Sequence, residues 1–302
     1  LHLTGGEPLL WKSLISALDD ACSLGYASVL INTNGTLLSK DICSRLGAYD
    51  KVSISVSLDG SKESHDHIRG FGQYERTRRG VANALDAGIP TIVFTIMYRS
   101  LLPQLPLFTS SIFSEFSSMS HICVILLMNT MNASFVLSNE LLRPTDFVRL
   151  IGGISLLNML GFRIDVLNEP LAYVAADLMK CPLSQWAPPV SHDKIIILLA
   201  DGSIGLSHFS QTNFGQYKAG RLEEILTSAA YREAMSPDQE ICPSCIYHKL
   251  CTGHGLYRPS ESTKYSLENT RYCQCVLDNI LEDKRNLRRG VMPYAQLEGR
   301  EA

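Results

Sequence analysis

The first 170 residues alternate short apolar segments with longer amphipathic ones, and this alternation limits the fold more than any other feature of the chain. Between the apolar segments, helical spacing is found near residues 9–24, 38–47, 74–87, 105–116 and 143–160. Parallel strands need crossovers of this kind, whereas antiparallel strands are joined by short turns. The pattern therefore predicts an α/β fold with a parallel sheet, whose strands cover residues 1–4, 29–33, 52–58, 91–97, 122–128 and 163–166.

Composition narrows the class of function. Of the 302 residues, 45% are hydrophobic and 19% are charged, which is an ordinary balance for a globular protein. A net charge of -3 gives no electrostatic basis for binding nucleic acid or an anionic membrane. The longest apolar runs are too short to span a bilayer, and the first residues lack the basic segment of a signal peptide. We therefore expect a cytoplasmic protein that binds neither nucleic acid nor membrane.

The first predicted strand ends in the sequence Thr4-Gly5-Gly6-Glu7-Pro8. Two successive glycines let bare backbone approach a ligand where a Cβ would clash. Glu7 adds a carboxylate at the C-terminal edge of the sheet, where α/β folds bind their ligands. Such an edge suits an ammonium group, although the same residues also fit a tight strand-to-helix turn with a surface glutamate.

The third predicted strand ends in Ser57-Leu58-Asp59-Gly60, and a polar segment that contains Arg69 follows. We predict that this segment is a loop that returns over the same edge of the sheet. The Ser57 hydroxyl and the Arg69 guanidinium would then converge on a carboxylate of a ligand. The alternative is a polar loop with a local pair between Arg69 and Asp59.

Both sequences are similar to motifs of the radical S-adenosylmethionine (radical SAM) enzymes. Gly-Gly-Glu-Pro after a strand resembles the turn that binds the amino group of SAM. Residues 57–70 resemble the S-[LM]-D-G-x4-H-D-x2-R-G segment of family members with a C-terminal SPASM domain. The resemblance implies that residues 1–170 form a partial (β/α)6-type barrel lacking its first strand. It also implies a SAM site, with the ammonium bound at Gly5, Gly6 and Glu7, the carboxylate at Ser57 and Arg69, and the edge between them closed by Asn32, Thr33 and Asn34. Pro8 and Asp59, within the two motifs, are further candidates for binding the cofactor.

A third motif of this family does not occur in the sequence. In the family, C-x3-C-x2-C after the first strand holds the 4Fe–4S cluster that cleaves SAM. That motif does not occur in these 302 residues, which open inside a predicted strand without a methionine. We therefore expect the sequence to be truncated, or cropped from a longer product, at its N-terminus.

The periodic pattern changes after about residue 181. Residues 194–199 and 203–206 predict a hairpin around Asp201-Gly202, and residues 221–235 predict one amphipathic helix. Five of the nine cysteines then follow, and clustered cysteines in a cytoplasmic protein favour a metal over disulfides. Four sulfurs suit either zinc or an iron–sulfur cluster, and spacing alone does not choose between them. The candidate ligands are Cys242, Cys245 and Cys251, with Cys273 or its alternate Cys275 as the fourth.

The cysteine pattern resembles the outer half of a SPASM domain. The resemblance implies an auxiliary 4Fe–4S cluster on Cys242, Cys245, Cys251 and Cys273, within a SPASM-like α+β domain over residues 171–276, followed by a C-terminal helix and tail over 277–302. The inner cluster is expected to be lost, because Ser207 and Gly255 stand where the family has cysteines, and Cys181 would be a leftover thiol. His208 stands at the place of a catalytic aspartate in sulfatase-maturing relatives. It is a weak candidate for a catalytic base and fits a pocket or core histidine better.

The resemblance also implies a function. The complete protein would cleave SAM reductively to a 5′-deoxyadenosyl radical, which abstracts hydrogen from a peptide or protein, with a flavodoxin or ferredoxin as reductant. Two alternatives stay open at this point. In the first, the chain is a remnant or pseudoenzyme that binds peptide or SAM without turnover. In the second, it is a binding module whose C-terminal cysteines hold structural zinc.

Overall fold

The computed structural model describes residues 1–127, 138–167, 169–181, 183, 196–205, 213–234, 245–247 and 263–288. Its centre is a sheet of six parallel strands in the order β1-β2-β3-β4-β5-β6. The predicted α/β fold with a parallel sheet is therefore confirmed. The strands are β1 (His2–Leu3), β2 (Val29–Thr33), β3 (Val52–Ser57), β4 (Thr91–Met97), β5 (Ile122–Leu126) and β6 (Ile164–Val166).

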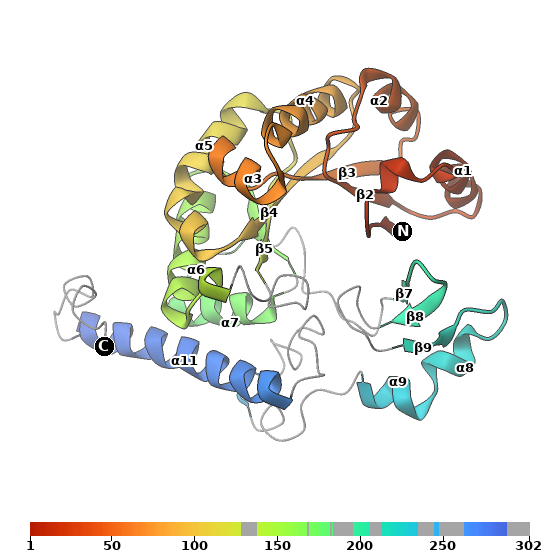
Figure 1. Ribbon diagram of the computed structural model, residues 1–302. Helices are drawn as coiled ribbons and strands as arrows, with labels where there is room; N and C mark the ends of the chain where they lie inside the picture. The colour runs from red at the N-terminus through yellow and green to blue at the C-terminus, as the bar shows by residue number, and fades with distance from the viewer. Residues whose placement is uncertain are drawn as a thin grey trace.

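Helices cover the outer face of this sheet in an arc (Figure 1). Side chains alternate along each strand, so that Val52, Ile54 and Val56 of β3 are buried in the main hydrophobic core. The other face is the inner face, and it carries the alternate residues of each strand. The helices are α1 (Leu14–Ser23), α2 (Lys40–Leu46), α3 (Lys62–Arg69), α4 (Gln73–Asp86), α5 (Leu105–Glu115), α6 (Pro144–Met159) and α7 (Pro170–Met179), with the short 3-10 helices η1 (Pro8–Leu10), η2 (Arg99–Gln104) and η3 (Ser138–Glu140).

Residues 62–69 form the helix α3, where the sequence predicted a loop. Helical periodicity is weak here because the segment is almost entirely polar. Its stability comes from its ends: Ser61 caps the helix by accepting a hydrogen bond from the amide of Ser64 at 3.3 Å. Glu63 lies in the first turn and Arg69 in the last, which matches the helix dipole. Arg69 is therefore held at the end of a helix.

The segment near residues 9–24 is also divided differently from the prediction of one helix. η1 and α1 are separate, with Pro8 at the start of the first and Ser13 immediately before the second. The Glu7 side chain caps η1 by accepting from the amide of Leu9 at 3.2 Å. Glu7 therefore sets where the chain leaves the sheet.

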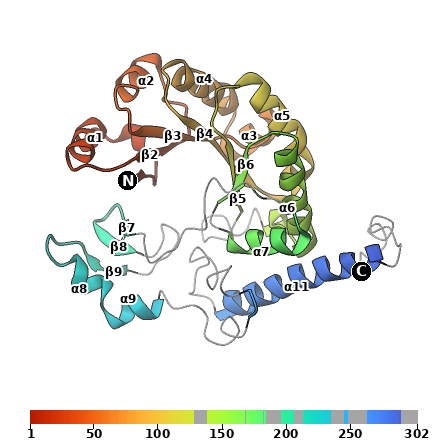
Figure 2. The ribbon, with the colours of Figure 1, turned by 180° about the vertical axis from the view of Figure 1, so that it is seen from behind.

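A second sheet lies apart from the first, below the β1–β2 end of the large sheet in both views (Figures 1 and 2). It is antiparallel and consists of β7 (Ile197–Leu198), β8 (Ser203–Gly205) and β9 (Asn213–Gln216). The predicted hairpin is confirmed, and β9 adds a strand that the sequence did not predict. The predicted helix over 221–235 is instead two helices, α8 (Leu222–Leu226) and α9 (Ala229–Ala234). The break follows from local bonds, because Thr227 bonds back to the carbonyl of Glu223 and Ser228 accepts from the amide of Tyr231.

The last helix, α11 (Thr263–Arg288), runs along α6 and α7. It starts well before the predicted C-terminal helix, and the rest of the predicted tail, residues 289–302, lies outside the described residues. Val276 and Ile280 are buried in the same core as the barrel helices, and the Tyr272 ring meets Phe147 edge-on at 6.1 Å. α7 joins this core as well. In the described part of the chain, therefore, α7 and α11 share one core with the sheet.

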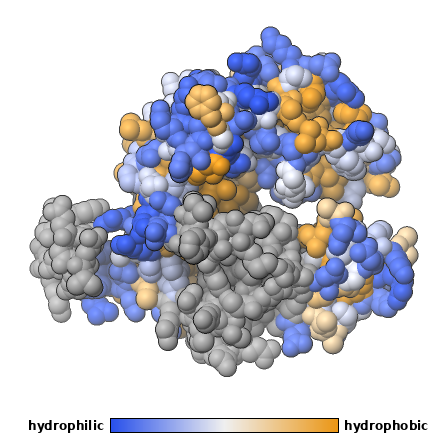
Figure 3. Space-filling view, viewed as in Figure 1, coloured by the Kyte–Doolittle hydropathy of each residue, from blue (hydrophilic) through white to orange (hydrophobic). Residues whose placement is uncertain are grey.

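The surface seen in Figure 3 is mostly hydrophilic over the barrel helices, with scattered apolar groups. Such scatter is normal for a folded domain and needs no partner to explain it. Among the described helices, none combines the length and the apolarity that crossing a membrane requires.

The packing of α11 predicts an asymmetric effect of mutations on its two faces. Ile280 is 2% exposed and Leu281 is 39% exposed. Ile280→Ala should lower the free energy of unfolding by about 2–5 kcal/mol because it leaves a cavity in the core. Leu281→Ala should change it by no more than about 0.5 kcal/mol. Urea unfolding of both variants checks this, and equal losses would show that α11 does not pack through the Ile280 face.

Candidate functional site

The structure brings the two predicted segments to one edge of the sheet. β1, β2 and β3 are neighbouring parallel strands, so their C-terminal ends meet on the same side. The Gly5–Gly6 turn follows β1, Asn34 follows β2, and Ser57 ends β3 next to Phe94 of β4. We call these residues, with Asp59 and Arg69, the strand-end site.

The glycine turn leaves open space at the strand-end site. Gly5 has φ +124°, a conformation that side chains rarely adopt. Gly6 has no such constraint, yet no atom of the described residues lies within 4 Å of the position that a Cβ would take at either glycine. By contrast, a Cβ at Gly35 would lie 2.6 Å from Cγ1 of Val56. Packing therefore explains the glycine at position 35, whereas among the described residues it does not explain the one at position 6.

Glu7 braces the turn against β2. Its Oε1 accepts a hydrogen bond from the Thr33 hydroxyl at 2.6 Å, and its Oε2 accepts from the amide of Asn34 at 2.9 Å. Together with the bond from Leu9, this gives the carboxylate three donors within the protein. Pro8 is buried just after it. The sequence predicted a carboxylate facing a ligand. In the structure this carboxylate also holds the turn to β2, and its contact with a ligand stays a prediction.

The two asparagines are also held within the protein. Asn32 donates to the Thr4 hydroxyl at 3.4 Å, and its Oδ1 accepts from the Ser55 hydroxyl at 3.2 Å. The side-chain oxygen of Asn34 accepts from the amide and the hydroxyl of Thr36 at 2.9 and 2.7 Å. The bonds of Asn32 connect β1, β2 and β3, whereas those of Asn34 shape the turn after β2.

A buried carboxylate orients Arg69. Asp59 is fully buried, and its Oδ1 accepts from the amide of Ile96 at the end of β4 at 2.8 Å. Its Oδ2 accepts from Nε of Arg69 at 2.5 Å. Within the described residues this is the one hydrogen bond of the Arg69 guanidinium, which leaves Nη1 and Nη2 for another group. The side chain of Arg69 is 25% exposed, so it can be reached from solvent.

His65 forms a hydrogen bond with the backbone of Asp59. Its ring is buried, and Nδ1 accepts a hydrogen bond from the amide of Asp59 at 3.1 Å. Burial lowers the pKa of His65, so the ring is neutral near pH 7. The sequence named this histidine only as part of a motif, and the periodicity of the chain carries no signal for its role.

The predicted metal ligands are described only in part. Cys242, Cys251 and the catalytic candidate His208 lie outside the described residues. Cys245 and Cys273 are half-buried, whereas Cys275 is exposed. In the part of the chain that the structure describes, no group of three or more His, Cys, Asp or Glu side chains is placed to hold a metal ion. Cys181, the predicted leftover thiol, is half-buried with its Sγ 3.7 Å from the carbonyl of Met179.

Residues 1–100 match the family model described as the radical SAM superfamily. This stretch contains both motifs and the whole strand-end site. Residues 1–100 are therefore identified as part of a radical SAM domain. The resemblance seen in the sequence is confirmed for this part of the chain.

The curated relatives match about a third of the chain. A probable GTP 3′,8-cyclase of Saccharolobus islandicus (strain Y.N.15.51 / Yellowstone #2) is 38% identical over 90 residues, which is 30% of this chain and 29% of that protein. An AdoMet-dependent heme synthase of Methanosarcina barkeri is 36% identical over 107 residues, 35% of this chain and 30% of that protein. The matched stretch is thus less than a third of these relatives, and their activities do not transfer with it.

Solved structures resemble a much larger part of the chain. The enzyme anSMEcpe with bound AdoMet and the Kp18Cys peptide superposes with a TM-score of 0.66 at 16% identity, over 95% of this chain and 85% of that one. SuiB of Streptococcus suis bound to S-adenosylmethionine gives a TM-score of 0.64 at 15% identity, over 84% of this chain and 61% of that one. At such identities the likeness establishes the fold alone.

The brace in the radical SAM domain predicts energetic coupling between Glu7 and Thr33. A double-mutant cycle with Glu7→Gln and Thr33→Val should give a coupling energy of about 0.5–3 kcal/mol in urea unfolding, because the two side chains share a short hydrogen bond. Thr36→Val is the matched control, since its hydroxyl bonds to Asn34 and not to Glu7. Equal coupling to Thr33 and Thr36 would contradict the brace.

Proposed function

We propose that the strand-end site binds S-adenosylmethionine and that the chain is part of a radical SAM/SPASM enzyme that modifies a peptide or protein. The observation that carries the proposal is the Arg69 guanidinium, oriented by buried Asp59 and lying at the same sheet edge as the open Gly5–Gly6 turn. The ammonium of the amino-acid group of SAM would lie at the glycine turn, and its carboxylate would lie at Arg69.

The residues present fit the methionine part of SAM. Backbone groups of Gly5 and Gly6 would take the ammonium, since none of the described residues fills the space beside them. The free nitrogens of Arg69 and the Ser57 hydroxyl would take the carboxylate, with the guanidinium in the bidentate manner typical of arginine. Glu7, Asn32, Asn34 and Asp59 would keep these groups in place through the bonds described above.

When SAM is bound beside a reduced 4Fe–4S cluster, the two together supply a radical that abstracts hydrogen from the substrate. The family's three-cysteine motif for that cluster does not occur in this sequence, so none of the chain's residues is assigned to it. The residues of the chain bind and orient the amino-acid end of SAM. A flavodoxin or ferredoxin remains the proposed reductant.

The inner face of the barrel favours a peptide over a nucleotide. The six strands that form it contain no lysine or arginine, and their one carboxylate is the buried Asp165. A triphosphate needs several cations, which these strands do not supply. The solved structures that match most of this chain include complexes with peptides, Kp18Cys in anSMEcpe and the precursor peptide SuiA in SuiB. Both observations support a peptide or protein substrate.

We propose further that the C-terminal cysteines hold an auxiliary 4Fe–4S cluster in a SPASM-like domain. Cys273 is the preferred fourth ligand to Cys242, Cys245 and Cys251. Cys273 and Cys275 are two positions apart on α11 and therefore lie on different sides of that helix. Cys273 is half-buried beside the core, while Cys275 faces solvent.

Replacing Arg69 tests the SAM site. Arg69→Lys keeps the charge but loses the fork that a carboxylate needs, so the Kd for SAM should rise roughly ten- to hundredfold. Arg78→Lys is the control, because Arg78 bonds to Glu75 and Glu115 on the outer helices. Calorimetric titration with SAM measures both. An unchanged Kd in Arg69→Lys would refute the proposed site.

Metal analysis of two cysteine variants tests the C-terminal site. After anaerobic purification, Cys273→Ser should lose its bound metal, whereas Cys275→Ser should retain the wild-type content. Iron with sulfide in the wild-type protein supports the auxiliary cluster. A colourless protein with one zinc ion would replace that proposal with the structural zinc site.

A further inference from the structure

The backbone that carries Arg69 reverses direction immediately after it. Arg69 is the last residue of α3, and α4 begins at Gln73. Gly70 and Gly72 lie between them with φ +106° and +76°. Glycine tolerates these angles but does not hold them, because it has more conformational freedom than any other residue. Something outside the turn must therefore fix its shape.

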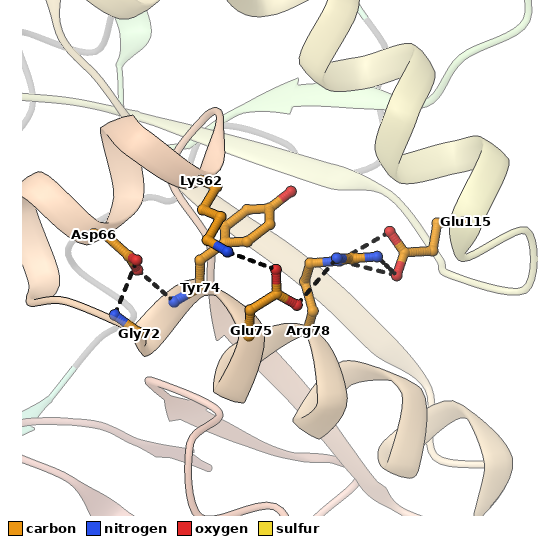
Figure 4. Close-up of polar contacts among 7 residues, drawn as sticks. All are labelled: Lys62, Asp66, Gly72, Tyr74, Glu75, Arg78 and Glu115. Carbon is orange, nitrogen blue, oxygen red and sulfur yellow. Dashed lines mark hydrogen bonds and ion pairs between the residues drawn. The ribbon is translucent and has the colours of Figure 1, made fainter.

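Asp66 supplies that restraint. Its Oδ2 accepts from the amide of Gly72 at 2.9 Å, and its Oδ1 accepts from the amide of Tyr74 at 2.8 Å, as Figure 4 shows. Gly72 occupies the cap position of α4 and has no side chain to cap the helix. The carboxylate of the preceding helix takes over this role and satisfies two amides at the start of α4.

The charge on Asp66 is favoured by this arrangement. The hydrogen bond from the amide of Tyr74 is the main reason why the pKa of Asp66 is lowered, and the amide of Gly72 acts in the same direction. Asp66 is therefore ionised at neutral pH. Because its pKa is lowered, it stays ionised at pH values where an ordinary aspartate begins to take up a proton, and only more acidic solution would remove the charge that holds the turn.

A second network connects α3, α4 and α5 and makes no hydrogen bond to Asp66 or to the amides that Asp66 accepts from. Arg78 of α4 pairs with Glu115 of α5 at 2.5 Å and with Glu75 at 3.3 Å, and Glu75 also pairs with Lys62 of α3 at 3.3 Å (Figure 4). The Arg78 guanidinium also lies over the Tyr74 ring. These groups are partly exposed and lie at the outer helices, so they provide a matched control for the effect of helix packing.

We infer that Asp66 is a positioning residue for Arg69. Asp59 fixes the guanidinium at Nε, and Asp66 fixes the backbone turn that follows Arg69, so the side chain is held from both of its ends. This inference rests on the proposed SAM site, because it concerns how the carboxylate-binding arginine of that site is held.

Titration with two ligands tests the inference. The ligands are SAM and 5′-methylthioadenosine, which lacks the amino-acid group that Arg69 would bind. Asp66→Ala and the milder Asp66→Asn should raise the Kd for SAM, by about tenfold for Asp66→Ala, because a displaced arginine loses its charge-assisted bonds. The Kd for 5′-methylthioadenosine should stay unchanged, and Glu115→Gln should change neither value.

Two further readouts separate positioning from general damage. Amide hydrogen exchange at Gly72 and Tyr74 should speed up in both Asp66 variants, because their acceptor is removed or altered. In the Arg69→Lys background, Asp66→Ala should weaken SAM binding little further, since both changes act on one contact. Equal weakening of both ligands would overturn the inference and assign Asp66 a purely structural role.

The two proposals can fail separately. If Arg69→Lys leaves the Kd for SAM unchanged, the SAM site itself is wrong. If Arg69→Lys weakens SAM binding but both Asp66 variants bind SAM like the wild type, the site stands and the positioning role of Asp66 is refuted.

Discussion

The geometry of the strand-end site depends on the buried carboxylate of Asp59. A carboxylate removed from water is costly unless hydrogen bonds and an opposite charge compensate it. Asp59 obtains both from the amide of Ile96 and the guanidinium of Arg69, which join β4 and α3 to the end of β3. Any change that moves one of these partners exposes an uncompensated buried charge. Arg69 is consequently oriented by the sheet, although it lies on a helix.

Glu7 repeats this arrangement on the other side of the site. It connects the turn after β1 to the end of β2, as Asp59 connects β3 to β4. The acidic residues of the two motifs thus serve as braces between neighbouring strands. The groups left for a ligand are backbone at the glycines, a hydroxyl and two guanidinium nitrogens. Under the proposed function, a site of this kind would meet the zwitterionic amino-acid group of SAM with little ordering on binding.

The sequence was sufficient for the sheet because its strands and crossover helices have strong, distinct periods. It was insufficient for α3, whose polar residues have no apolar stripe and whose helix depends on Ser61, on helix-end charges and on the turn held by Asp66. It was also insufficient for the break between α8 and α9, where local bonds of Thr227 and Ser228 outweigh helical periodicity. The motifs located the strand-end site. The structure was needed to show that the carboxylate oxygens of Glu7 and Asp59 are already hydrogen-bonded within the protein.

The comparisons match different lengths of the chain. The family model covers residues 1–100, which hold every residue of the strand-end site, while the solved structures follow most of the chain at 14–16% identity. This difference has a physical basis. Under the proposed function, the SAM site requires its hydroxyl, glycines and guanidinium, whereas the remaining strands need only keep their apolar faces and parallel pairing. The inner face of β4, β5 and β6 would then be free of that constraint. Its residues include Cys123 and Asp165, which are buried and paired across β5 and β6, and under the same proposal substrate selection would act on this part of the barrel.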